Sequence, residues 1–270
     1  MMKKKSWLLN IVGILIILLH ISPLYITFMT SLKKKTDLSS KWFLPDKFSL
    51  DNYKNALAGN EFFQALFNTI IVTVGGIAIV VIVGAITGYV LARRKNMLTS
   101  LMLLATMGVM MVPGISLIVP LYNTMLTIGG INTFWGITLL VGTSHLPVSI
   151  FIYMNFIKSI PRELDEAAEM DGCGTLRTFF SIIMPQLGAV TASVLILNGV
   201  KIFNEFLYAL YFLQSPDKKM ITTFISGYFN ENSNLNEASA AALLATLPVI
   251  IVYIMLQKYF VKGNIDGIGK

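Results

Sequence analysis

Residues 96–157 contain no Asp, Glu, Lys or Arg, and this uncharged run of 62 residues restricts the possible folds more than any other feature. A helix needs about 20 apolar residues to cross a hydrocarbon core of about 30 Å, so the run can hold two crossings and a turn. The turn is expected at residues 127–132, which are rich in helix breakers. Because an open sheet would leave unpaired backbone groups in lipid, the run predicts helices.

Four other apolar segments predict four more crossings, which makes about six in all. They are expected at residues 7–29, 62–92, about 187–210 and about 238–257. The first is too long for a signal-peptide core and no cleavage-like site follows it, so it is interpreted as an uncleaved span. Gly84 and Gly88 in the second predict close helix packing. The predicted fold class is all-α, a polytopic membrane protein.

The composition agrees with lipid as the main solvent. Charged residues make up 13% of the chain and hydrophobic residues 55%, whereas soluble domains carry roughly 25% charge. The net charge of +7 comes from residues between the apolar runs, which argues against a nucleic-acid partner. Cys173 is the one cysteine, so an internal disulfide and a cysteine-built metal site are excluded.

With six crossings, both termini lie on one side of the membrane, and that side carries twelve basic residues against eight on the other. This bias predicts cytoplasmic termini, although Lys33, Lys34 and Lys35 follow the first span on the outer side. The predicted parts are an N-terminal transmembrane helix (1–30), an extracytoplasmic loop (31–61) and a core (62–270). The core includes a loop at 158–186 and a cytoplasmic tail at 258–270.

The loop at 158–186 concentrates five of the fourteen acidic residues within nine positions. Acids in the first turns of a helix suit its positive end, so a short helix is predicted there. Ala167 and Ala168 would let this helix seat closely in a groove on another protein, and Gly172 would end it. A second short helix is expected from residue 175 toward 185. The residues alone leave a solvated amphipathic connector equally open.

The spacing within this loop resembles the EAA motif of binding-protein-dependent ABC importer permeases. The matching residues are Glu166, Ala167, Ala168, Gly172, Ile182, Met184 and Pro185, with Met184 where the family favours Leu. Three further segments resemble the second permease subunit of the maltose-type carbohydrate family. They are Ser31-Leu32-Lys33, Phe203-Asn204-Glu205-Phe206 and Phe260-Val261-Lys262-Gly263, the last followed by Gly267, Gly269 and Lys270.

The resemblance implies a non-catalytic pore subunit that imports a sugar, such as an oligosaccharide, across the bacterial cytoplasmic membrane. It implies three partners besides membrane lipid: a homologous second permease, a cytoplasmic ATPase dimer and an extracytoplasmic sugar-binding protein. ATP and Mg would be bound by the ATPase, with no cofactor in this chain. The implied ATPase-coupling residues are Glu166, Ala167, Ala168, Asp171 and Gly172. The implied tail contacts with the ATPase are Lys262, Gly263, Gly267 and Lys270.

A polar group in the predicted fifth span could border a sugar path, since hydroxyl-rich ligands need donors and acceptors. Its members are Asn198, Lys201, Asn204 and Glu205. Lys201 and Glu205, four residues apart, are expected to share one helix face. The alternative for this pair is an interfacial position from which both side chains reach the membrane surface.

Other functions stay open at this point. The chain could be an ABC permease for another solute, such as a polyamine or a phosphonate. A secondary transporter acting alone would more often show intramembrane acids and inverted repeats. An intramembrane enzyme lacks support, because the sequence shows no set of nucleophile and base.

Overall fold

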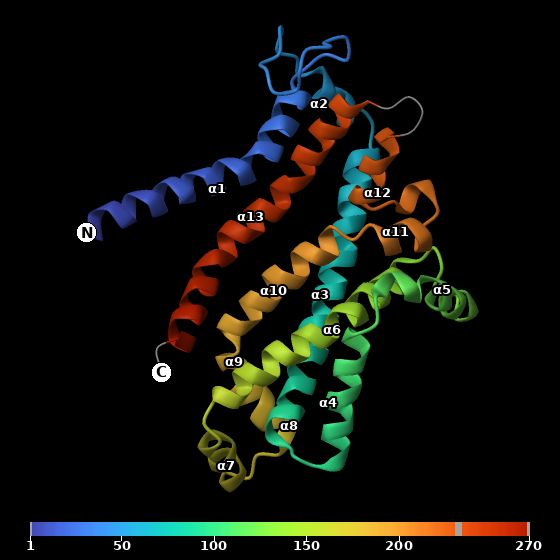
Figure 1. The fold of residues 1–270 in the computed structure, drawn as a ribbon. Coiled ribbons are helices and arrows are strands. Elements are labelled where there is room, and N and C mark those ends of the chain that lie inside the picture. Colours follow the sequence, from blue (N-terminus) through green and yellow to red (C-terminus); the bar gives the residue numbers. More distant parts are fainter. Residues whose placement is uncertain (1, 230–233, 269–270) are drawn as a thin grey trace. The chain divides into compact units, whose positions relative to one another are not determined.

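The computed structural model describes residues 2–229 and 234–268, and every regular element in those ranges is a helix (Figure 1). Four helices are long and apolar enough to cross a membrane: α1 (Met2–Ser31), α3 (Glu61–Arg93), α6 (Phe134–Ser159) and α13 (Leu235–Ile268). Two bent helix pairs pass the same test, which raises the number of candidate spans to as many as six. The all-α prediction is confirmed.

The predicted third span is bent. It consists of α4 (Met97–Met110), the 3-10 helix η1 (Gly114–Leu117) and α5 (Ile118–Thr127), with an angle of 98° at the break. Pro113 lies at this break in an extended conformation, and its ring nitrogen cannot donate the next helical hydrogen bond. The turn expected at residues 127–132 is present, with positive φ at Gly129 and Asn132 between α5 and α6.

The predicted fifth span, residues 187–210, is not one helix. Its main part is α10 (Gly188–Phe203), and a break at residues 204–206 separates it from α11 (Leu207–Phe212). Beyond these lie three short elements, η3 (Pro216–Lys218), α12 (Ile221–Ser226) and η4 (Gly227–Phe229). The hydropathy pattern therefore located the apolar segment correctly but missed its interruption.

The segment before α10 forms the second short helix that the sequence predicts. It runs through α8 (Thr175–Thr178), the π-helical turn η2 (Phe179–Ile183) and α9 (Met184–Gln186), and it meets α10 at 77°. Pro185 has no N–H to donate to the carbonyl four residues earlier, so the backbone widens just before it.

The chain forms two compact units, one of Met1–Phe63 with Thr223–Leu247 and one of Gln64–Thr222 with Pro248–Lys270. In the second unit, α6 packs against α3 and α10 around fully buried side chains that include Val80, Tyr153 and Ile202. Gly88 permits this packing, because a Cβ atom there would lie 2.8 Å from Cβ of Tyr153. The expectation of close helix packing in the second span is confirmed.

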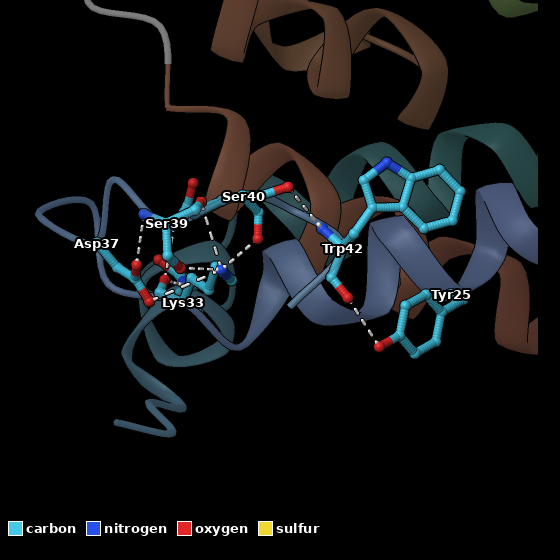
Figure 2. Close-up of polar contacts among 8 residues, drawn as sticks. Tyr25, Lys33, Asp37, Ser39, Ser40 and Trp42 are labelled. Carbon is cyan, nitrogen blue, oxygen red and sulfur yellow. Dashed lines mark hydrogen bonds and ion pairs between the residues drawn. The ribbon is translucent and has the colours of Figure 1, made fainter. Parts of the chain in front are cut away.

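In the first unit, the end of α1, the short helix α2 (Asp51–Ala56) and the loop between them share a network of hydrogen bonds (Figure 2). The network centres on Lys33, whose side chain is buried at 2% exposure. Of the three lysines that follow the first span, only Lys34 and Lys35 therefore present exposed side chains.

Candidate functional site

The acidic segment folds into α7 (Glu163–Met170), which Figure 1 shows at one end of the second unit, beyond the end of α6. Three acids lie in its first turn, where the helix dipole favours negative charge. The helix ends at Met170, Gly172 follows it with a φ of +77°, and the N–H of Cys173 donates to the carbonyl of Ala168 at 2.9 Å. Gly172 therefore makes the predicted helix stop in a left-handed conformation.

An ion pair joins α7 to the end of α3. Nη2 of Arg93 lies 2.9 Å from Oδ2 of Asp165, and the Tyr89 hydroxyl donates to Oδ1 of the same carboxylate at 2.6 Å. Nη2 and Oδ2 have no hydrogen-bond partner, so their contact is electrostatic and not a well-aligned hydrogen bond. Each carboxylate oxygen of Asp165 therefore contacts one residue of α3, either Arg93 or Tyr89. These two contacts hold α7 against the end of α3.

Two further contacts support the same junction. Nη1 of Arg93 donates to the carbonyl of Ile160, just before α7, at 3.1 Å. Nη2 of Arg162 donates to the carbonyls of Ala92 and Arg93 at 3.5 and 3.4 Å, where a cation suits the negative end of α3. We call Tyr89, Arg93, Arg162 and Asp165 the α3–α7 junction. It ties the acidic segment to a long candidate span.

The outer surface of α7 and of the following turn combines acidic and apolar side chains. Met170 is 88% exposed, and Ala167 and Leu176 are also exposed beside the carboxylates of Glu166 and Asp171. We call these five residues the docking face. Met170 lies outside every candidate span, so lipid does not account for its exposure, and this surface is suited to contact with another protein.

Ala168 does not belong to the docking face. It is 2% exposed and packs within its own chain, so its small size serves the seating of α7 on the rest of the unit. The expectation that both alanines would face another protein is therefore wrong for Ala168. The hydropathy of an alanine pair gives no sign of which member points inward.

Glu166 borders a polar cleft that is also lined by Arg93, Arg94 and Arg162. Among the side chains that the structure describes, no basic group lies within ion-pair distance of its carboxylate. Glu166 therefore keeps an exposed negative charge that a basic group on another protein could meet.

Four residues of the predicted sugar path fall into different environments. Asn198 is buried and donates to Oγ of Ser149 and the carbonyl of Val194, so it ties α10 to α6. Glu205 accepts a hydrogen bond from the Tyr208 N–H in the first turn of α11. Because α10 ends at Phe203, Lys201 and Glu205 are not on one helix face. Lys201 and Asn204 are exposed.

Three of the four predicted tail contacts lie near the end of α13. Lys262, Gly263 and Gly267 belong to the C-terminal part of α13, where the backbone is helical. Lys270 lies outside the described residues.

Sequence reasoning missed the α3–α7 junction, although its parts were visible. Arg93 belongs to the basic run Arg93-Arg94-Lys95, which by itself indicates only membrane topology, and Asp165 is one of the five acids at residues 163–171. The basic run follows the second predicted span, and the acidic cluster follows the fourth. Both are expected on the same side of the membrane, and this shared position could have suggested that they form an ion pair.

Replacing Gly172 with Ala is expected to destabilise the end of α7 by about 1–2 kcal/mol, because a residue with a Cβ is strained at this φ. A Cβ atom at position 172 would meet no other atom within 4 Å, so strain and not a clash is responsible. The reactivity of Cys173 toward a thiol reagent measures the effect and should rise. Gly174→Ala is the matched control, since Gly174 has equal space and a negative φ.

Comparisons with known proteins support the assignment of this fold. The chain is 36% identical over 267 residues to the melibiose/raffinose/stachyose import permease protein MelC of Bacillus subtilis, covering 98% of this chain and 96% of MelC. It is 31% identical to the probable starch degradation products transport system permease protein AmyC of Thermoanaerobacterium thermosulfurigenes, covering 97% and 96%.

A solved structure shows the same fold. One chain of a bacterial ABC transporter involved in the import of the acidic polysaccharide alginate superposes with a TM-score of 0.82, at 20% identity, covering 96% of this chain and 97% of that one. The model of the family of binding-protein-dependent transport system inner membrane components matches residues 81–265. The chain therefore belongs to the family of binding-protein-dependent transport system inner membrane components.

Proposed function

We propose that this chain is a permease subunit of an ATP-driven ABC importer that moves a sugar, such as an oligosaccharide, into the cell. Family membership supports the importer, and the names of relatives such as MelC and AmyC support a sugar as the substrate. The docking face is the single observation in the structure that favours coupling to another protein. The chain is not itself an enzyme in this proposal.

The docking face would seat on a cytoplasmic ATPase subunit, which binds ATP and Mg while this chain binds no cofactor. Met170 and Leu176 supply the apolar contact, and Glu166 and Asp171 supply charges that a basic rim would meet. Movement of the ATPase would pass through α7 to the α3–α7 junction. Because Asp165 connects to Tyr89 and Arg93 by direct contacts, α3 would follow α7.

The termini and α7 would then lie on the cytoplasmic side, and the loop after α1 on the outer side. The buried, paired side chain of Lys33 weakens the charge argument against this orientation, because it is not a free cation near the membrane. The remaining partners in this proposal are a homologous second permease and an extracytoplasmic sugar-binding protein. One solved relative of the fold is in complex with an alginate pentasaccharide-bound periplasmic protein.

Two residue groups complete the proposal. The tail residues Lys262, Gly263, Gly267 and Lys270 would touch the ATPase. Lys201 and Asn204 are the better candidates for a sugar path, because their side chains are exposed, whereas Asn198 is buried and Glu205 is partly buried.

Purification of the full-length chain with its associated subunits tests the docking face. Met170→Asp places a charge in the apolar centre and is expected to weaken ATPase binding by about 2 kcal/mol or more, roughly thirtyfold. The amount of co-purified ATPase, and uptake of labelled oligosaccharide by cells, should fall together. Leu38→Asp, at an equally exposed residue far from the docking face in sequence, is the control.

Three results would contradict parts of the proposal. If the wild-type chain elutes without an ATPase or a second permease and still transports, it is a secondary transporter. If Met170→Asp and Leu38→Asp retain equal amounts of ATPase, the docking face lies elsewhere. Deletion of the chain that leaves oligosaccharide uptake intact would instead point to another solute.

A further inference from the structure

The end of α1 is held by a buried cation. Nζ of Lys33 donates to the carbonyl of Ser40 at 2.9 Å and to Oγ of Ser39, and it lies 3.9 Å from Oδ2 of Asp37 (Figure 2). Hydrogen bonds from Ser39 hold the pKa of Asp37 below its ordinary value, and Lys33 contributes to the same shift. A buried ammonium group is stable only with such partners, so residues 37–40 must wrap around it.

The backbone carbonyl of Lys33 also accepts two hydrogen bonds from other segments. The donors are Nδ2 of Asn52 at 2.8 Å and Nδ2 of Asn236 at 2.7 Å. These contacts join the end of α1 to α2 and to the first turn of α13, all within the first unit. We call Lys33, Asp37, Ser39, Ser40 and Asn52 the Lys33 cluster. It gives the loop after α1 a defined starting direction.

From this cluster the chain turns back along α1. The carbonyl of Trp42 accepts a hydrogen bond from the Tyr25 hydroxyl at 3.1 Å, and Figure 2 shows the two residues beside each other. Tyr25 precedes the helix end at Ser31 by about 9 Å along the axis, at about 1.5 Å per residue. Trp42 therefore lies beside the apolar part of α1 and not beyond its end.

The residues at this position are apolar and uncovered. Trp42 is 57% exposed, Phe43 68% and Leu44 63%, and we call these three consecutive residues the wedge. The same loop carries four exposed lysines: Lys34, Lys35, Lys41 and Lys47. Tryptophan is favoured at the boundary between hydrocarbon and water, and lysines attract anionic lipid head groups.

We propose that the wedge inserts into the lipid head-group region of the leaflet at which α1 ends. The uncharged part of α1 spans residues 7–29, slightly more than the roughly 20 residues that the hydrocarbon requires, so Tyr25 lies near the boundary. The Tyr25 hydrogen bond sets the depth of the wedge, and the Lys33 cluster sets its direction. The inference needs only that α1 crosses the membrane, and it is independent of what the importer carries.

Spin labelling of the intact complex in lipid bilayers tests this insertion. Cys173→Ser removes the native thiol of this chain, and Phe43→Cys then carries a nitroxide in the wedge. Oxygen concentrates in lipid and a nickel chelate stays in water, so oxygen accessibility should exceed nickel accessibility at position 43. The order should invert for Leu38→Cys, because Leu38 is 94% exposed beside the Lys33 cluster. The signal of the Cys173→Ser complex supplies the background from other subunits.

Each alternative environment gives its own result. Nickel accessibility above oxygen accessibility at position 43 would place the wedge in water, and low values for both would place it under another protein. Either result overturns the insertion. Leu44→Cys repeats the measurement where Phe43→Cys lowers the yield of the complex. Adding Tyr25→Phe, which removes only the hydroxyl, should move the label toward the nickel-accessible phase.

Discussion

Replacement of Arg93 with Met is expected to release α7 from α3 and to speed the chemical labelling of Cys173. The substitution leaves Asp165 without its cation, and breaking one partner of a buried ion pair costs about 3–5 kcal/mol. The side chains of Arg93 and Asp165 are 10% and 19% exposed, so partial solvation reduces this to about 1–2 kcal/mol. Labelling of Cys173 should accelerate about tenfold, since 1.4 kcal/mol corresponds to a factor of ten.

Uptake of labelled oligosaccharide should fall in the same variant, while ATP hydrolysis by the assembled complex should persist. The reason is that the docking face remains on α7, whereas the connection through the junction is weakened. A variant that lost both activities would have lost assembly instead. Measurement of both rates on one preparation separates these cases.

Two further variants isolate the ion pair. Arg94→Met removes an equal charge from the exposed neighbouring residue and should leave Cys173 labelling unchanged. The double variant Arg93→Met with Asp165→Leu removes both charges and should restore slow labelling, because no uncompensated carboxylate remains. If Arg94→Met accelerates labelling as much as Arg93→Met, the net charge of the segment and not the junction holds α7.

Replacement of Gly88 with Leu is expected to destabilise the second unit by about 3 kcal/mol. A Cβ atom at position 88 would lie 2.8 Å from Cβ of Tyr153 and 3.0 Å from the backbone N of Met154. Backbone atoms cannot rotate away as the end of a flexible side chain can, so α3 and α6 would have to separate. Thermal unfolding in detergent, or the yield of folded protein, measures the loss.

Gly108 provides the matched control for this change. It lies in α4, and a Cβ atom there would meet no other atom within 4 Å. Gly108→Leu should therefore leave stability unchanged or raise it slightly, because Leu favours helix over Gly by up to about 1 kcal/mol. Equal losses in both variants would show that glycine is needed for a reason other than the packing of α3 on α6.

Some features of the coupling segment followed from local sequence alone. Acids at the start of a helix and a glycine just past its end act on neighbouring backbone groups, so α7 and its stop at Gly172 were predictable. The pairing of Asp165 with Arg93 was not, since it depends on how α7 is rotated against α3. The inward position of Ala168 depends on the same rotation.

In the two bent spans too, local sequence indicates some features and tertiary packing decides others. Hydropathy measures transfer into lipid and located each apolar segment, and the helix breakers at residues 127–132 located the turn after α5. Hydropathy does not register helix direction, so it indicates neither the 98° bend near Pro113 nor the break at residues 204–206. In the second break, α10 ends at Phe203, so Glu205 does not share a helix face with Lys201 and instead accepts a hydrogen bond from the Tyr208 N–H in the first turn of α11.

The sequence by itself determined that the chain is a bundle of lipid-crossing helices with one acidic segment outside the bilayer. These properties depend on solvation and on contacts between close neighbours in the chain. Tertiary structure alone decided which charges are buried and paired, as for Lys33 and Arg93, and which apolar residues stay uncovered, as for Met170 and Trp42. The physical reason is that burial depends on the packing of segments distant in sequence, and a local pattern carries no measure of that packing.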